Sequence, residues 1–247
     1  MILNIGWLYP KQMSTYGDRG NILTIAKRCE WRGIKAKLIE IEPGQILKKG
    51  TADFYFFGGG QDQAQSLVAE DLKKNKKSAL SHDTEAGAVL LGVCGGYQLI
   101  GHFYQPTVGK EISGIGLLDV YTEAGERRMI GNIVVETDPK LVKTELVGFE
   151  NHSGRTFLQK GTSHLGKVLI GYGNNGEDRL EGAWKRNIFG CYLHGPLLPK
   201  NPRFADFLIE KALRSKYGAI ELAPLEDSLE LLAHESAFKR SKEVPKI

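Results

Sequence analysis

Cys94 is the residue of this sequence whose surroundings most clearly indicate chemistry. It follows the apolar run Ala88 to Leu91, and glycines stand two positions before and two positions after it, at Gly92 and Gly96. A buried strand that ends in Gly-x-Cys-x-Gly is typical of a tight strand-to-helix turn, because side chains at the glycine positions would collide with the backbone. The spacing therefore predicts a nucleophile elbow with the cysteine at its tip.

The predicted turn would also favour the reactive form of the thiol. At a helix N-terminus, unpaired N–H groups and the positive end of the helix dipole stabilise a thiolate. A buried cysteine that acts only as a small hydrophobic side chain is the alternative, and the two flanking glycines argue against it. We therefore expect Cys94 to be a nucleophile.

His194 is the best placed of the six histidines to exchange a proton with this thiol. It follows the strand-like run Ile188 to Leu193 and precedes a Gly-Pro pair. This position puts it in a loop at the carboxyl end of a strand, the edge of an α/β sheet at which the turn at Cys94 is also expected. Cys94 and His194 are therefore the predicted catalytic residues.

Three consecutive glycines, Gly58 to Gly60, follow the strand-like run Asp53 to Phe57. Such a triplet lets the backbone come close to a ligand and point its N–H groups into a cleft. A flexible turn is the alternative explanation of the triplet alone. Beside a cysteine elbow on a neighbouring strand, it is better explained as part of an oxyanion hole.

The elements around these residues predict an α/β fold with a central, mostly parallel sheet flanked by helices. Buried strands are expected at 2–8, 35–41 and 53–57, with helical spacing between them and Asp18 as the N-cap of the first helix. From Gly114 onward, short strands between turns predict added antiparallel strands. Their expected ranges are 115–121, 130–137, 145–149 and 168–171, with turns at 123–126 and 173–178.

Two helices are expected in the last part of the chain. The pattern over 201–217 begins with Asn201 as its N-cap, and 225–239 predicts a shorter helix with a solvated basic end. We expect residues 1–218 to form one domain and residues 219–247 to form a C-terminal helical tail.

Composition excludes several classes of protein. The 247 residues are 41% hydrophobic and 25% charged, with a net charge of +4, as in an ordinary soluble protein. No apolar run reaches the roughly 18 residues that cross a bilayer, and no signal-peptide pattern is present, so we expect a cytoplasmic protein without a transmembrane segment. Neither a nucleic-acid partner nor a metal site is expected. Cys29 and Cys191 are expected to pack in the core.

Several longer motifs, in the same order along the chain, resemble those of class I glutamine amidotransferases of the cobyric acid synthase-like branch. The resemblance extends from Tyr16 to about Leu213. Its motifs lie at 16–21, 58–65, 94–98, 148–156, 171–175 and 192–196. It implies the class I glutamine amidotransferase fold for residues 1–218.

The resemblance also implies that L-glutamine is hydrolysed to glutamate and ammonia. Cys94 would attack the side-chain amide and His194 would move the proton. Backbone N–H groups of Gly95 and of the Gly59-Gly60 turn would hold the oxyanion.

In the family, an arginine at the position of Arg128 binds the glutamine substrate. A guanidinium can hold an α-carboxylate with two parallel hydrogen bonds. From spacing alone, the neighbouring Arg127 fits this role as well.

One departure concerns the residue that orients the histidine. Many class I members have His-x-Glu, whereas this chain has His194-Gly195-Pro196, as does the branch that it resembles. We hypothesise that the orienting acid comes from a partner subunit or from another loop, with Glu150 as the internal candidate.

Ammonia from such a domain normally supplies a synthetase. The chain has no Gly-x-x-x-x-Gly-Lys-Ser/Thr segment, so no cofactor is expected in it. The resemblance implies a MurT-like Mur ligase as a heterodimeric partner. That partner would use ATP and magnesium to activate the D-glutamate α-carboxylate of the lipid II stem peptide, which ammonia converts to D-isoglutamine during peptidoglycan synthesis.

Three alternatives stay open. The chain could be a glutaminase subunit for another acceptor, such as a corrinoid carboxylate, which the identity of the partner would decide. It could be a non-catalytic interaction subunit, which the intact cysteine elbow and His194 argue against. It could also be a cysteine peptidase with a similar elbow, which failure to release ammonia from glutamine would favour.

Overall fold

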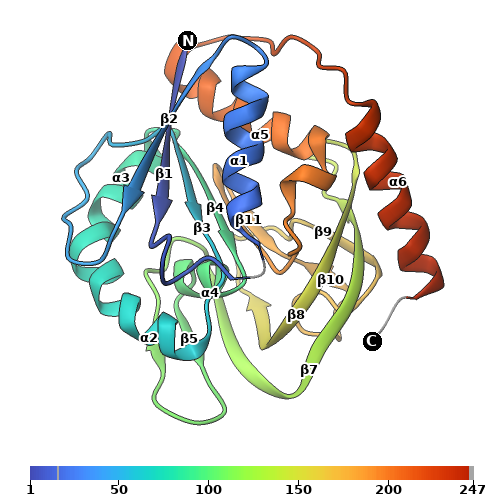
Figure 1. Ribbon diagram of the computed structural model, residues 1–247. Helices are drawn as coiled ribbons and strands as arrows, with labels where there is room; N and C mark the ends of the chain where they lie inside the picture. The colour runs from blue at the N-terminus through green and yellow to red at the C-terminus, as the bar shows by residue number, and fades with distance from the viewer. Residues whose placement is uncertain (16, 245–247) are drawn as a thin grey trace.

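A computed structural model describes residues 1–15 and 17–244 and confirms the predicted α/β architecture (Figure 1). Tyr16, where the family motifs begin, and residues 245–247 of the expected tail lie outside the described residues. The first sheet has six strands in the order β11-β12-β4-β3-β1-β2. These strands are β1 (Ile2–Leu8), β2 (Lys35–Ile41), β3 (Phe54–Phe57), β4 (Val89–Val93), β11 (Ala183–Lys185) and β12 (Ile188–Cys191).

Neighbouring strands of the first sheet are parallel, except that β11 pairs antiparallel with β12. Every residue of β3 and β4 is buried, as expected of apolar strands covered by helices on both faces. In Figure 1, α1 and α5 lie to one side of these strands and α3 lies to the other. The helices are α1 (Arg19–Glu30), α2 (Asp62–Asp71), α3 (Lys77–Glu85), α4 (Gly95–Ile100), α5 (Pro202–Tyr217) and α6 (Ser228–Glu243), with a π-helical turn η1 (Leu72–Lys76) and a 3-10 turn η2 (Leu198–Lys200).

The added antiparallel strands form a second sheet beside the first, and only β11 extends the first sheet. Two long strands, β7 and β8, pair along most of their length. The second sheet comprises β5 (Phe103–Gln105), β6 (Ile112–Ser113), β7 (Val120–Thr137), β8 (Glu145–Leu158), β9 (Gly166–Ile170) and β10 (Leu180–Glu181).

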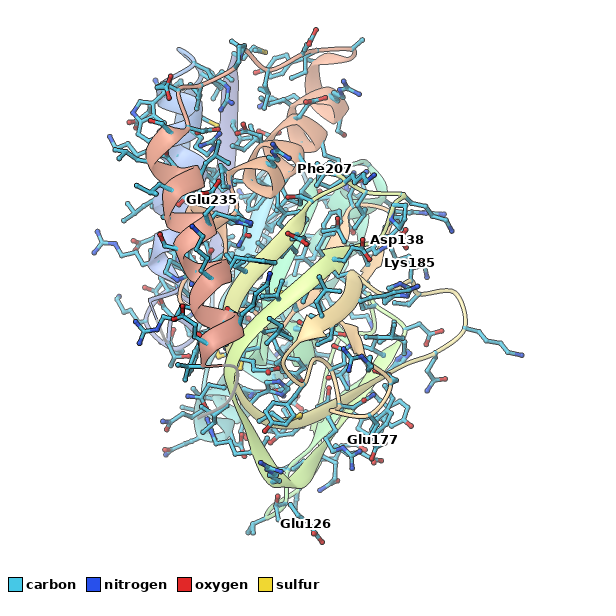
Figure 2. The ribbon with its side chains drawn as sticks, turned by 90° about the vertical axis from the view of Figure 1, so that its right-hand side faces the viewer. Glu126, Asp138, Glu177, Lys185, Phe207 and Glu235 are labelled. Atoms are coloured by element: carbon cyan, nitrogen blue, oxygen red, sulfur yellow. The ribbon has the colours of Figure 1, made fainter. Side chains whose placement is uncertain are left out.

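Two details of the predicted antiparallel region are wrong. The strand expected at 115–121 begins only at Val120, and the turn expected at 123–126 lies inside β7. There the register with β8 shifts between Ala124 and Met129, so the glycine and charged residues form a bulge instead of ending the strand. Figure 2 shows Glu126 of this bulge at the bottom of the molecule, with Asp138, just beyond β7, well above it.

The C-terminal segment is tied to the rest of the fold by a buried cation. The guanidinium of Arg28, on α1, bonds Asp206 of α5 at 2.6 Å and Asp227, just before α6, at 2.7 Å. Helix α6 contains the basic residues that were expected to form a solvated tail, and it packs against η2, β7 and β8. The boundary at residue 218 stays a prediction.

Residues 1–15 and 17–244 contain neither a membrane-spanning helix nor a cluster of metal-binding side chains. None of the helices there is both long enough and apolar enough to span a membrane. No group of three or more His, Cys, Asp or Glu side chains there could hold a metal ion.

Candidate active site

Cys94 stands between β4 and α4 with φ 53° and ψ −109°, a backbone conformation that is costly for a residue with a side chain. Its neighbours make the sharp turn possible. A Cβ atom at Gly96 would collide with the carbonyl oxygen of Phe57, and one at Gly92 would lie 2.9 Å from Cδ1 of Ile100. The predicted elbow is therefore confirmed.

His194 reaches the same edge of the sheet because β12 lies directly beside β4. The two strand ends are joined where the Cys94 N–H donates to the carbonyl oxygen of Cys191 at 2.8 Å. The backbone of His194 is held by Phe149 of β8 through two hydrogen bonds, of 2.8 and 3.2 Å. The second sheet thus fixes the histidine that follows a strand of the first.

Asp18 supplies the carboxylate that the sequence around His194 lacks. Its Oδ1 lies 3.5 Å from Nδ1 of His194, and the two side chains are 0% and 1% exposed. Asp18 occupies the N-cap position of α1 but makes no side-chain capping hydrogen bond, so the predicted capping role is wrong. Its Oδ2 instead accepts a hydrogen bond of 2.6 Å from the Gly59 N–H.

The charge around His194 favours its protonated form. Burial lowers the pKa of His194, but the charge of Cys94, hydrogen bonding to Asp18 and Cys94, and the charge of Asp18 together raise it to about 10. Since Asp18 faces Nδ1, the other ring nitrogen, Nε2, is the one left to serve the thiol. This arrangement suits a thiolate and imidazolium pair.

Glu150 does not orient His194, so that internal candidate is wrong. Its carboxylate accepts hydrogen bonds from the N–H groups of Tyr172 and Gly173 at 2.7 and 2.9 Å. The histidine nearest to it is His152, whose Nε2 lies 3.9 Å from Oε2 of Glu150. Of the two hypothesised sources, the structure places another loop of this chain, the one with Asp18, beside His194.

The glycine triplet lies against the elbow as predicted, but its members differ in role. A Cβ atom at Gly95 would lie 3.0 Å from the Gly60 nitrogen, so these two backbone segments touch. The Gly59 N–H already donates to Asp18. Gly60 and Gly95 therefore remain the candidates for the oxyanion hole, and Gly59 serves instead to position the carboxylate.

Cys94 opens into a cavity of about 360 Å³, within the range of small-molecule sites. Arg128 lines this cavity, and its Nε donates to Oδ1 of Asn151 at 2.6 Å. Arg127 contacts Tyr172 and is not among the lining residues. The bulge in β7 therefore separates the two arginines, and the geometry favours Arg128 as the substrate-binding one.

Sequence reasoning assigned no role to three polar side chains that line the cavity, namely Gln65, Gln98 and His152. Gln65 donates to Gln98 at 2.9 Å, and Gln98 donates to the hydroxyl of Tyr192 at 3.1 Å. The position of Gln98, one helical turn after Cys94, was a signal that could have found it. Asp18 and His152 lie within the motifs at 16–21 and 148–156, but no spacing there indicates what their side chains contact.

Cys29 and Cys191 are both fully buried, which confirms that they pack in the core. Burial raises the pKa of Cys29 to about 12 and that of Cys191 well above its ordinary value. Neither thiol is placed to react.

The match to a known family agrees with this geometry. Residues 4–202 match the model of the CobB/CobQ-like glutamine amidotransferase domain. The chain belongs to this family. It is 40% identical over 230 residues to the lipid II isoglutaminyl synthase (glutamine-hydrolyzing) subunit GatD of Staphylococcus aureus, covering 93% of this chain and 92% of that protein. The subunit GatD of Streptococcus pneumoniae is also 40% identical, over 97% of this chain and 92% of its own length.

The chain is also similar to cobyric acid synthases, at lower identity, and to solved glutamine amidotransferase structures. The cobyric acid synthase of Limosilactobacillus reuteri is 29% identical, over 89% of this chain but only 44% of its own length. In structure, the chain is similar to PurLQS from Thermotoga maritima, with a TM-score of 0.55, 15% identity, and coverage of 87% of this chain and 97% of that one. A glutamine amidotransferase from the same organism gives a TM-score of 0.53 at 15% identity, over 98% and 92% of the two chains. These structures confirm the class I glutamine amidotransferase fold.

Proposed function

We propose that this chain is the glutaminase subunit of a two-subunit ligase. It hydrolyses L-glutamine to glutamate and ammonia, and the ammonia amidates the D-glutamate of the lipid II stem peptide to D-isoglutamine. The observation that carries the glutaminase activity is the set Cys94, His194 and Asp18 at one edge of the sheet, beside a cavity that also contains Arg128. The acceptor rests on the two GatD relatives.

In the first half of the reaction, the Cys94 thiolate attacks the side-chain amide carbon of glutamine. A carbon–sulfur bond forms while the carbonyl oxygen takes the electron pair, and the N–H groups of Gly60 and Gly95 stabilise that oxyanion. His194 then donates its proton to the amide nitrogen. The carbon–nitrogen bond breaks, ammonia leaves, and a γ-glutamyl thioester remains on Cys94.

In the second half, His194 acts as a base. It removes a proton from a water molecule as the water oxygen attacks the thioester carbon. Collapse of this intermediate breaks the carbon–sulfur bond and releases glutamate. The thiolate and imidazolium pair is restored, with Asp18 holding Nδ1 of His194 throughout.

Ammonia must reach an activated carboxylate before it escapes to solvent. We propose a MurT-like Mur ligase as the partner, with ATP and magnesium bound on that subunit, and the cytoplasm as the site of the reaction. A corrinoid carboxylate remains the second acceptor, but the cobyric acid synthase relative is matched over less than half of its length.

Ammonia release from glutamine tests this proposal. The full chain is assayed alone and after co-expression with a Mur ligase-like subunit, beside Cys94→Ala as the matched control. Release that depends on Cys94, and that the partner increases, supports the assignment. No release in either state contradicts the glutaminase activity, and release followed by amidation of a corrinoid but not of lipid II contradicts the acceptor.

A further inference from the structure

The two ring nitrogens of His152 have different hydrogen-bonding roles, because only Nδ1 has a partner among the described residues. The residue lies on β8 and lines the cavity, and its side chain is 1% exposed. The ring stacks on that of Tyr192 with centroids 3.6 Å apart and planes 5° apart. Nδ1 lies 2.7 Å from the carbonyl oxygen of Gly154. Because a carbonyl oxygen can only accept, Nδ1 carries the proton of this bond.

Nε2 of His152 is therefore a hydrogen-bond acceptor in the neutral ring. Burial lowers the pKa of His152, which outweighs the raising effect of Glu150. The carboxylate of Glu150 is 3.9 Å from Nε2, too far for a hydrogen bond. Within residues 1–15 and 17–244, Nε2 is buried without a hydrogen-bond partner. Two buried acceptors, Nε2 of His152 and the carboxylate of Glu150, thus lie close together, and no described protein group donates to Nε2.

His152 lines the cavity into which Cys94 opens. Asn151 contacts Arg128, and side chains alternate along a strand, so His152 projects from the opposite face of β8. Tyr192, on which it stacks, lies two residues before His194. His152 and Arg128 therefore line the same cavity as Cys94 from different strands, and His152 is close enough to His194 for the charge of His194 to lower its pKa.

The substrate and the product of a glutaminase differ in what they offer to such an acceptor. The side-chain amide of glutamine has two N–H donors, but the carboxylate of glutamate has none and is negative. We propose that His152 Nε2 accepts a hydrogen bond from the amide nitrogen of glutamine, and that Glu150 behind it repels the product carboxylate. His152 thus determines selectivity for the amide over the acid. This inference rests on the proposed glutaminase function.

Equilibrium binding of both ligands tests the proposal directly. In the Cys94→Ala chain, glutamine is not consumed, so its Kd and that of glutamate can be compared by calorimetry. His152→Phe is added to keep the aromatic stack and remove the acceptor. His152→Gln is added because its amide can turn to donate or to accept. His82→Phe, on α3, is the matched control, since that histidine is half exposed.

The quantity to follow is the ratio of the glutamate Kd to the glutamine Kd. His152→Phe leaves an N–H of the substrate amide unmatched and should lower this ratio roughly tenfold. His152→Gln should also lower it, because its amide can donate to the carboxylate of glutamate. His82→Phe should leave it unchanged. A purely structural role would weaken both ligands equally, as would a contact to the α-ammonium group, and an unchanged ratio in both His152 variants overturns the proposal.

Different results contradict the glutaminase function and the role of His152. A wild-type chain that releases no ammonia, alone or with its partner, contradicts the proposed function whatever the binding ratio. An active wild type with an unchanged ratio in the variants contradicts only the role of His152. A Cys94→Ala chain that binds no glutamine also contradicts that role.

Discussion

Nδ1 of His194 lies 3.5 Å from Oδ1 of Asp18, although the two residues come from opposite ends of the matched domain. The same carboxylate accepts the N–H of Gly59 through its other oxygen. One side chain thus orients the proposed general acid and also holds the glycine turn beside the elbow. This arrangement supplies within one chain the acid that a His-x-Glu sequence supplies elsewhere in the class.

Asp18→Asn should move the alkaline limit of activity to lower pH. The imidazolium of His194 must donate a proton to the leaving nitrogen, so activity falls as pH rises through its pKa, raised to about 10 in this site. Removing the charge of Asp18 lowers that pKa, and the fall then begins at lower pH. We expect kcat/KM at neutral pH to drop roughly 10²-fold. Profiles of kcat/KM against pH measure both effects, and a shift in Glu150→Gln but not in Asp18→Asn would reverse the assignment.

Arg128→Lys should weaken glutamine binding, and Arg127→Lys should not. Arg128 lines the cavity, whereas Arg127 packs on the ring of Tyr172. A lysine cannot form the two parallel hydrogen bonds of a guanidinium, so KM for glutamine should rise roughly tenfold or more in Arg128→Lys. Steady-state kinetics of the two matched variants decide the point, and equal effects would show that Arg128 has no special contact with the substrate.

Cys94→Ala should separate ammonia production from amidation. In the complex with the proposed ligase partner, glutamine-dependent amidation should fall to background, because no thioester can form. Amidation driven by added ammonium salt should persist, since ATP-dependent activation is proposed for the other subunit. Mass spectrometry of the amidated product measures both. Loss of both activities would mean that Cys94 supports the complex and not hydrolysis.

Glu181→Gln should stabilise the protein at alkaline pH. Burial raises the pKa of Glu181 from 4.5 to about 8, and the side chain accepts the Tyr192 N–H at 2.6 Å. Between these two values the unfolded carboxyl is ionised while the folded one holds a proton, so this group makes stability fall as pH rises. Glutamine keeps the acceptor and removes the titration. Urea unfolding near about pH 6 and about pH 9 should show a smaller loss in the variant than in the wild type.

Arg28→Met should loosen the C-terminal segment. The substitution leaves Asp206 and Asp227 without their shared cation, and breaking a buried ion pair costs about 3–5 kcal/mol. We expect a lower free energy of unfolding and faster proteolytic cleavage within residues 219–227. Lys27→Met, which breaks only an exposed pair with Glu30, is the control and should change little. Equal cleavage rates in the two variants would mean that Arg28 does not retain α6.

The parts of the fold that could be predicted are those specified by local sequence. Strand β2 spans the predicted Lys35–Ile41, and the elbow at Cys94 follows from two glycines within four residues of each other. His194 could be placed because strand ends collect at one edge of a parallel sheet. Each of these inferences needs only neighbouring residues and a general topological rule.

The parts that could not be predicted depend on contacts between distant segments. Asp18 has the sequence position of a helix cap, and nothing nearby shows that its side chain turns toward His194 instead. The bulge that brings Arg128 to the cavity has the composition of a turn, and only pairing with β8 keeps it within a strand. The Gly59 N–H donates to Asp18, a contact that the glycine triplet alone does not predict.

The paired backbone of Phe149 and His194 limits how the site can move. Cys94 follows a strand of the first sheet and Arg128 lies on β7 of the second, so these two hydrogen bonds join the two sheets that line the cavity. Moving the two sheets apart would break both bonds and remove the contact that fixes the His194 backbone. These bonds therefore favour a cavity whose two walls are already in place before glutamine binds.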